Sequence, residues 1–148
     1  MEYAGRTFEY RQLGDFTYHL LADPAAIRAL LMKWIVLEWE TDHREAPDES
    51  WTVEWMHRLP VMSFRLEVVD LDAVRPRADL MSVPEFRAGL EQRADEREQA
   101  MLRGVSIEPL LVDRDGLELM DGYTRHAVLQ RRRQKQIYAY IGEKKAIV

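Results

Sequence analysis

The chain has 148 residues, of which 47% are apolar, 32% charged and 9% aromatic, the composition of one folded globular domain rather than of a disordered or fibrous chain. It contains no cysteine, which excludes disulfide scaffolds, zinc knuckles, iron–sulfur clusters and thiol nucleophiles. The net charge of −5 disfavours binding to nucleic acid, although basic side chains outnumber acidic ones in residues 105–148.

Neither a membrane span nor a signal peptide is visible in the sequence. The longest apolar stretch, around residues 27–37, is broken by Arg28 and Lys33 and is shorter than the roughly 20 residues that cross a bilayer. Residues 1–6 contain no basic stretch followed by an apolar one. We therefore expect a cytoplasmic protein that does not enter a membrane.

Residues 1–50 are expected to form an N-terminal extension dominated by one amphipathic helix. Apolar residues alternate within residues 1–13, which predicts a short strand or hairpin. Asp23 as N-cap and Pro24 in the first turn predict the start of a helix that runs to about Glu40. Spacings of three and four give this helix one apolar stripe, which consists of Ile27, Leu30, Leu31, Trp34 and Ile35.

Residues 41–50 contain five charged residues and Pro47, which predicts a solvated loop and a boundary between the extension and a main domain of residues 51–148. Two interpretations of the next segment stay open. Trp51, Val53 and Trp55 alternate as in a strand, whereas Trp51, Trp55 and Leu59 share a helical face. The tryptophans are expected to be core or interface residues, and exposed ones would mark a surface for a protein partner or for self-association.

The first half of the main domain is expected to contain a strand and a long helix. Residues 62–70 alternate between apolar and polar side chains, which predicts a strand, and a loop with Arg75-Pro76-Arg77 follows. Ser82-Val83-Pro84-Glu85 has the capping-box pattern and predicts a helix from there to Arg103, ended by Gly104. The many charged side chains of this helix are interpreted as a solvated face.

The second half is expected to contain a hairpin, a helix and a last strand. Apolar runs at residues 109–113 and 117–120 flank Asp115-Gly116, a strong hairpin signal. A helix follows Gly122, and residues 137–141 form another strand. The expected fold class is therefore α+β, a small mixed sheet with packed helices and an N-terminal helical extension.

The segment Asp121-Gly122-Tyr123-Thr124-Arg125 carries the most chemical information. A strand that delivers a glycine directly into a helix start lets the backbone approach a ligand, and free N–H groups at the helix N-terminus attract an anion. Arg125 in the first turn adds a bidentate partner for phosphate. The alternative interpretation, equally open, is that Asp121 caps the helix and Arg125 pairs with a carboxylate.

From about Phe64 to Gly142, the succession of strand, Arg-Pro loop, helix, hairpin, Asp-Gly-x-x-Arg, helix and strand resembles the ParB/sulfiredoxin superfamily. The resemblance covers roughly half of the chain, and it is most specific between Ile107 and Ile141. It implies that Asp121, Gly122 and Arg125 cradle nucleotide phosphates, with backbone N–H groups from Tyr123 and Thr124.

The branches of the superfamily imply different functions. Sulfiredoxins carry a cysteine beside the motif glycine, where this chain has Tyr123, so that branch is excluded. Chromosome-partitioning ParB proteins use the fold as a CTP switch and continue into a helix-turn-helix region, whereas this chain ends at Val148, so we expect no sequence-specific DNA binding. The leading expectation is a stand-alone binding or switch module for a nucleotide (ATP, ADP or CTP, with magnesium) or another phosphorylated small molecule.

The alternative expectation is a small-molecule kinase, because a third branch comprises free-serine kinases. That branch has His-Glu after the loop proline, but Pro76 is followed by Arg77-Ala78-Asp79, so only Asp79 could act as the base. Asp121 would then hold the magnesium ion. A phosphotransferase of this kind makes Asp79 and Asp121 the candidate catalytic residues.

Two other features are weaker candidates. The basic run of residues 131–135 is interpreted as a solvated helix end rather than a nucleic-acid contact. The four histidines have no metal-ligand spacing, so no metal site is assigned to them. His126, beside Arg125, is a further candidate for the pocket lining, with a solvent-exposed side chain as the alternative.

Overall fold

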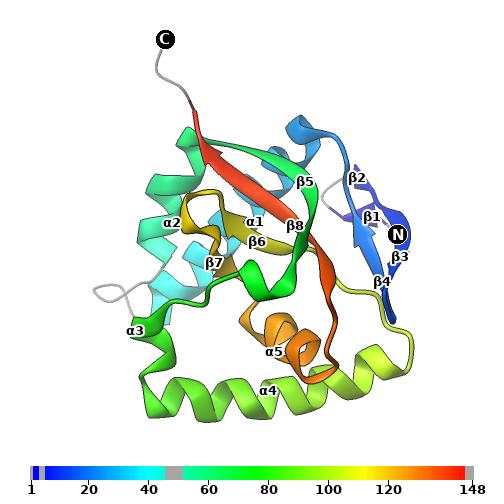
Figure 1. Cartoon of the computed structure of the whole chain (residues 1–148). Helices are drawn as coiled ribbons and strands as arrows, with labels where there is room; N and C mark the ends of the chain where they lie inside the picture. Colours follow the sequence, from blue (N-terminus) through cyan, green and yellow to red (C-terminus); the bar gives the residue numbers. More distant parts are fainter. Residues whose placement is uncertain (1, 4–5, 46–51, 146–148) are drawn as a thin grey trace.

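The computed structural model describes residues 2–3, 6–45 and 52–145 of the chain (Figure 1). The strands are β1 (Glu2–Tyr3), β2 (Arg6–Thr7), β3 (Glu9–Leu13), β4 (Phe16–Leu20), β5 (Met62–Asp70), β6 (Leu110–Asp113), β7 (Glu118–Asp121) and β8 (Gln136–Lys144). The helices are α1 (Pro24–Glu45), α2 (Thr52–Arg58), α3 (Ala78–Met81), α4 (Pro84–Leu102) and α5 (Tyr123–Arg131). The predicted α+β class is confirmed.

A four-stranded mixed sheet with the order β5-β8-β6-β7 forms the centre of the fold. The long strands β5 and β8 pair antiparallel along their whole length, from Met62 opposite Lys144 to Asp70 opposite Gln136. β6 is parallel to β8 and antiparallel to β7. The predicted hairpin at Asp115-Gly116 is the β6–β7 connection, where Gly116 has φ +65°.

Alternation along the strands sends side chains to two separate cores, one on each face of the sheet. Leu110 and Val112 of β6 lie in the first core with Val128 and Leu129 of α5. Leu111, between them in sequence, lies in the second core, which also contains the apolar stripe of α1. Helices α4 and α5 therefore cover one face, and α1 and α2 cover the other (Figure 1).

The N-terminal strands form a hairpin that is longer than the sequence predicts. β3 pairs antiparallel with β4, and Gly14, at the turn, has φ +61°. Gly14 therefore supplies the turn that joins the two strands. The hairpin is attached to the main sheet region by a hydrogen bond from the His19 N–H to the carbonyl of Ile107, at 2.9 Å.

Helix α1 begins as predicted. The N–H of Ala26 donates to Asp23 Oδ2 at 2.9 Å, which is an N-cap bond. Of the predicted stripe, four residues are buried and Trp34 is half-buried, and the buried ones are Ile27, Leu30, Leu31 and Ile35.

The C-terminal end predicted for α1 was wrong. The helix continues to Glu45 instead of ending near Glu40, so residues 41–45 of the predicted loop are helical. No glycine or proline interrupts the chain between Glu40 and Glu45, so no strong helix breaker ends the helix at Glu40. The boundary predicted between residues 50 and 51 lies outside the described residues and stays a prediction.

The open question at residues 51–59 is settled for α2, because Thr52–Arg58 is helical and both Trp55 and Leu59 are buried. Trp51 lies outside the described residues.

The start of α4 corrects the predicted capping box. The helix begins at Pro84, its N-cap is Val83, and no side chain caps it. Ser82 instead follows the short helix α3, and its hydroxyl donates to the carbonyl of Asp79 at 2.9 Å. Ser82 is therefore the C-cap of α3, a short helix that the sequence did not predict, and not the N-cap of α4.

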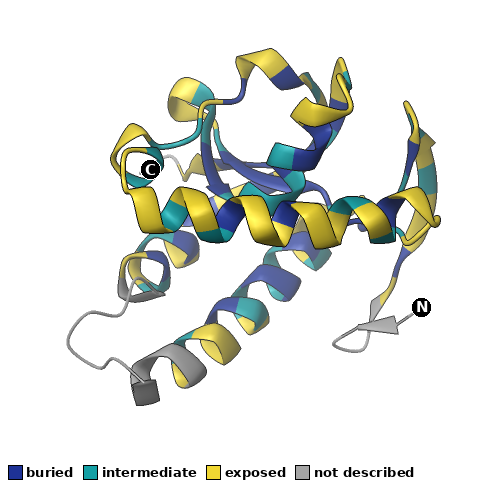
Figure 2. Ribbon diagram, turned by 90° about the horizontal axis from the view of Figure 1, so that it is seen from below, coloured by how far each residue is buried: buried dark blue, intermediate teal, exposed yellow. Residues whose placement is uncertain are grey.

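Helix α4 is amphipathic in the sense the sequence predicts. Leu90, Ala94 and Met101 are buried, and Gly104 follows the helix with φ +92°. Figure 2 shows this long helix exposed over most of its outer surface, with buried positions on the side that faces the rest of the molecule. No described helix is long and apolar enough to cross a membrane.

Candidate functional site

The connection from β7 to α5 is built around Gly122. This residue has φ +103°, a left-handed conformation that a side chain makes costly. A Cβ added there would lie 2.6 Å from Arg125 Nη2 and 2.7 Å from Leu110 Cδ2. The glycine is therefore required both by its own backbone and by the arginine that packs over it.

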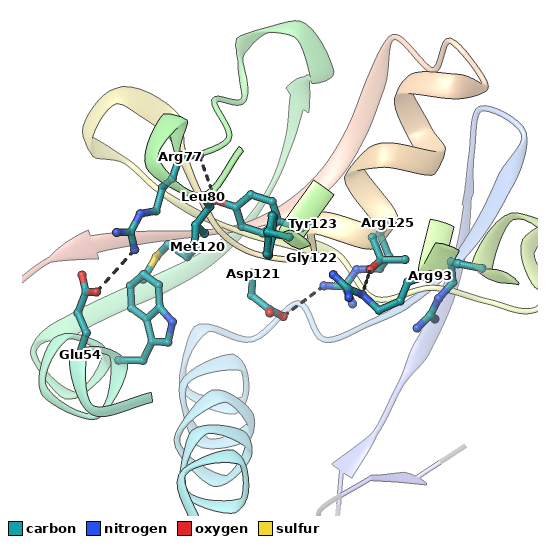
Figure 3. Close-up of a pocket in the computed structure, with 13 residues that line it drawn as sticks. Glu54, Arg77, Leu80, Arg93, Met120, Asp121, Gly122, Tyr123 and Arg125 are labelled. Atoms are coloured by element: carbon teal, nitrogen blue, oxygen red, sulfur yellow. Dashed lines mark hydrogen bonds and ion pairs between the residues drawn. The ribbon is translucent and has the colours of Figure 1, made fainter. Parts of the chain in front are cut away.

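A pocket of about 640 Å³ opens at this connection (Figure 3). It lies at the edge strand β7, where α2 from one face of the sheet and α4 and α5 from the other approach each other. Five consecutive residues, Asp121 to Arg125, line it. The remaining walls come from Glu54 and Trp55 of α2, Arg77 and Leu80, Met120 of β7, and Phe86, Arg93 and Arg97 of α4.

Arg125 lies at the base of this pocket with few hydrogen bonds. Its side chain is only 13% exposed, yet its Nη1 is 3.6 Å from Glu108 Oε2 and its Nη2 is 3.5 Å from Asp121 Oδ2. Charge-assisted hydrogen bonds are about 2.7–2.9 Å long, so both ion pairs are loose. The buried Nε has no hydrogen-bond partner within the described residues. The guanidinium thus keeps donor capacity for a ligand.

The N-terminus of α5 supplies further donors. The first intrahelical bond closes at His126, whose N–H donates to the carbonyl of Gly122 at 2.8 Å. The N–H groups of Tyr123, Thr124 and Arg125 precede it and have no partner inside the helix. No side chain caps this end, because the N-cap residue is a glycine. Amide donors and the helix dipole together favour an anion here.

The pocket is basic although the chain is acidic. Four arginines line it, at positions 77, 93, 97 and 125, against two carboxylates, Glu54 and Asp121. Arg93 lies beside the helix start, with its Nε 3.4 Å from Thr124 Oγ1. The local field is therefore opposite in sign to the net charge of −5.

The two carboxylates beside Arg125 respond differently to their surroundings. Burial raises the pKa of Asp121, and Arg125 opposes this rise while Glu108 adds to it. The side chain of Asp121 nevertheless stays 43% exposed, so water and ligands reach it from the pocket. The contact with His19, assisted by Arg125, lowers the pKa of Glu108. Glu108 is therefore the more firmly ionised of the two.

Tyr123 holds the Arg-Pro loop against the pocket. Its hydroxyl accepts from the N–H of Arg77 at 3.0 Å and donates to the carbonyl of Leu119 at 3.2 Å. Its ring packs edge-on against Phe86, with 5.6 Å between the ring centroids. One side chain thus connects β7, the loop and α4, and it fixes the position of Arg77.

Two of the predicted site residues are not brought into the pocket lining. Asp79 is 64% exposed and pairs with Arg77 at 2.8 Å, and this arginine lowers the pKa of the carboxyl group. His126 is 3% exposed, burial lowers its pKa, and its Nε2 has no hydrogen-bond partner within the described residues. The functional roles of both residues stay predictions.

Several residues of the pocket were not singled out in the sequence. Arg93 and Arg97 are four residues apart on one helix face, a signal that was present but interpreted as ordinary solvation. Glu54 carried no signal and Trp55 was predicted only as a core or interface residue, because their place in the pocket depends on the packing of α2 against Met120. Within the described residues, no group of three or more histidine, aspartate or glutamate side chains is arranged to hold a metal ion.

Comparisons with known proteins give a similarity of fold only. No protein-family model matches the chain, and no curated protein matches it. The chain is similar to the pNOB8-like ParB N-domain in two solved structures. The C2221 form has a TM-score of 0.44 and 20% identity over 55% of this chain and 30% of the other. The second structure has a TM-score of 0.44 and 21% identity over 57% of this chain and 29% of the other.

The chain thus spans less than a third of the chains that it matches. Both of these structures are ParB N-domains. In fold, the chain is similar to ParB N-domains. The free-serine-kinase branch stays a prediction from the sequence.

Proposed function

We propose that the chain binds a nucleotide, or a similar phosphate-bearing small molecule, with its phosphates at the N-terminus of α5. The observation that supports this proposal is the state of Arg125, a largely buried guanidinium whose Nη1 and Nη2 are held by two loose ion pairs. Buried polar groups are almost always hydrogen-bonded, and the cost of leaving them unpaired favours a ligand that completes them. A phosphate matches the planar donor fork of arginine.

The size and charge of the pocket support a ligand with more than one phosphate. A volume of about 640 Å³ is in the range of small-molecule sites. A second hollow of about 300 Å³ is lined by Arg93, Glu96, Arg97, Ala100 and Thr124, and it shares Arg93, Arg97 and Thr124 with the pocket. A chain of phosphates could run from Arg125 along this surface of α4.

Asp121 is the residue that would hold a magnesium ion in such a complex. Its carboxylate is 43% exposed and belongs to the lining of the pocket. Magnesium is commonly bound by one or two carboxylates together with phosphate oxygens and water, so a single aspartate fits. The ion would neutralise part of the phosphate charge.

The kinase alternative has less support. Phosphoryl transfer requires a base within reach of the acceptor hydroxyl. Asp79, the residue expected for this role, is paired with Arg77 and does not line the pocket. We therefore favour a binding or switch module over a phosphotransferase. Its protein partner or self-association through the N-terminal extension stays a prediction.

Titration calorimetry of the full chain with ATP, ADP, CTP and inorganic tripolyphosphate in magnesium tests the proposal. Hydrogen bonds to charged groups contribute about 1.5–3 kcal/mol, so Arg125→Ala is expected to weaken binding by at least about tenfold. Arg125→Lys retains the charge without the fork and should recover only part of the affinity. Arg131→Ala, on the same helix but paired with Asp95 outside the pocket, is the matched control.

The proposal is contradicted if none of the four ligands binds, or if Arg125→Ala binds them as well as the control does. Circular dichroism spectra of all variants show whether a loss of binding reflects a loss of folding.

A further inference from the structure

The end of the pocket opposite Arg93 is formed by a pair of charged side chains from two elements. Figure 3 shows Glu54 and Arg77 together at this end, with Met120 and Leu80 between them and the glycine of the helix start. Glu54 belongs to α2, which precedes the part of the sequence that resembles a known family. Nothing in the proposed phosphate site uses this pair.

Glu54 is held so that one of its oxygens remains available. Oε1 accepts from Arg58 Nη1 at 3.0 Å, which fixes the carboxylate. Oε2 is 3.6 Å from Arg77 Nη1, too far for a good hydrogen bond. This oxygen can therefore accept a hydrogen bond from a ligand.

Arg77 is held in a complementary way. Its Nη2 is 2.8 Å from Asp79, and its backbone N–H donates to the hydroxyl of Tyr123 at 3.0 Å. Among the residues that the structure describes, Nη1 has only the loose contact with Glu54, so it keeps donor capacity. An acceptor and a donor, each fixed by other contacts, thus lie side by side at one end of the pocket.

The surroundings of this pair suit a flat ring. Leu80, Met120, Phe86 and Trp55 line the same pocket. Trp55 is 6% exposed and has Arg58 stacked 4.5 Å from its ring, so it forms a firm wall and not a mobile flap. Apolar walls with a few placed polar groups are typical of sites that recognise a small molecule.

We propose that Glu54 and Arg77 read the edge of a heteroaromatic base that carries an amino group next to an unprotonated ring nitrogen, as adenine and cytosine do. The amino group donates to Glu54, and the ring nitrogen accepts from Arg77. Hypoxanthine and uracil present a carbonyl and a ring N–H at the same positions, which places acceptor against acceptor and donor against donor. This inference rests on the proposed function, because it concerns the other end of the same ligand.

Two matched pairs of nucleotides test the inference by calorimetry in magnesium, namely ATP with ITP and CTP with UTP. Within each pair the phosphates and ribose are identical. The wild-type chain is expected to bind at least one amino-bearing nucleotide about tenfold more tightly than its oxo counterpart, since a site built around hydrogen bonds rejects the mismatched edge. Inorganic tripolyphosphate reports the phosphate end alone.

Glu54→Gln places an amide where the acceptor was, and it is expected to reduce this preference to less than about twofold or to reverse it. Its affinity for tripolyphosphate should not fall, because the phosphate end keeps all its donors and the substitution removes a negative charge from the pocket. Glu143→Gln, on β8 and outside this pocket, is the matched control and should keep the full preference.

The outcomes separate the two proposals. Equal affinities within both wild-type pairs, with phosphate binding intact, overturn the base-reading role and leave the proposed function standing. A preference that survives Glu54→Gln also overturns it. Failure of all nucleotides and of tripolyphosphate to bind overturns the proposed function and the inference together.

Discussion

At the scale of single residues, Gly122 is the position on which the site depends most. Gly122→Ala combines a left-handed backbone at φ +103° with a Cβ 2.6 Å from Arg125 Nη2. Gly104→Ala is a matched control, because Gly104 has φ +92° and no atom of the described residues lies within 4 Å of a Cβ added there. In both variants the left-handed backbone is expected to lower the free energy of unfolding by about 1 kcal/mol. We expect urea unfolding to show a larger decrease for Gly122→Ala, and we expect this variant to bind ligand more weakly. Equal losses of stability with unchanged binding would contradict this account.

Some residues of the site could be predicted from the sequence and others could not. Asp121 to Arg125 are adjacent in sequence, so a strand, a glycine and a helix start were enough to place them together. Glu54 and Arg77 are far apart in sequence and meet only through the packing of α2, which no local pattern encodes. Asp79 was predicted as a catalytic base from the family resemblance, and in the structure its carboxylate forms an ion pair with Arg77.

At the scale of elements, Tyr140 attaches the N-terminal segment to β8. Its hydroxyl accepts from the N–H of Leu21 at 3.0 Å, and burial raises its pKa to about 12. Tyr140→Phe leaves the Leu21 N–H unpaired in the interior, which is expected to lower the free energy of unfolding by about 1–3 kcal/mol. Tyr10→Phe, at a residue that is 52% exposed, should change it by less than about 0.5 kcal/mol. Urea unfolding measures the free energy of unfolding of both variants, and equal values would contradict a stabilising role for the Tyr140 hydroxyl.

Elements with a strong local signal were predictable. The strand at residues 62–70 and the hairpin around Asp115-Gly116 are where alternation and turn chemistry placed them. The boundaries of the helices were less predictable. Ser82 fits a capping box, but the short helix α3 before it uses the same hydroxyl, and four residues are too few to give a periodic signal.

At the scale of the whole molecule, the N-terminal residues share a core with the sheet. Ile27 and Ile35 of α1 lie in one cluster with Phe64, Leu111 and Tyr140. A shared core predicts one cooperative unfolding transition. Trp34 and Trp39 lie in α1, and Trp51 and Trp55 lie just after the predicted boundary, so tryptophan fluorescence reports residues 34–55 while circular dichroism reports the whole chain. Coincident urea transitions are expected, and an earlier fluorescence transition would contradict the shared core by showing that the region of residues 34–55 unfolds before the rest of the chain.

The central claim is that phosphates bind at the start of α5, and amide chemical shifts test it most directly. Titration of the ¹⁵N-labelled chain with tripolyphosphate in magnesium is expected to move the amide signals of Gly122 to Arg125 most, because their N–H groups would meet the anion. The basic run at residues 131–135 serves as the internal comparison, since it would attract an anion by charge alone. Shifts confined to that run, with Gly122 to Arg125 unmoved, would contradict the account.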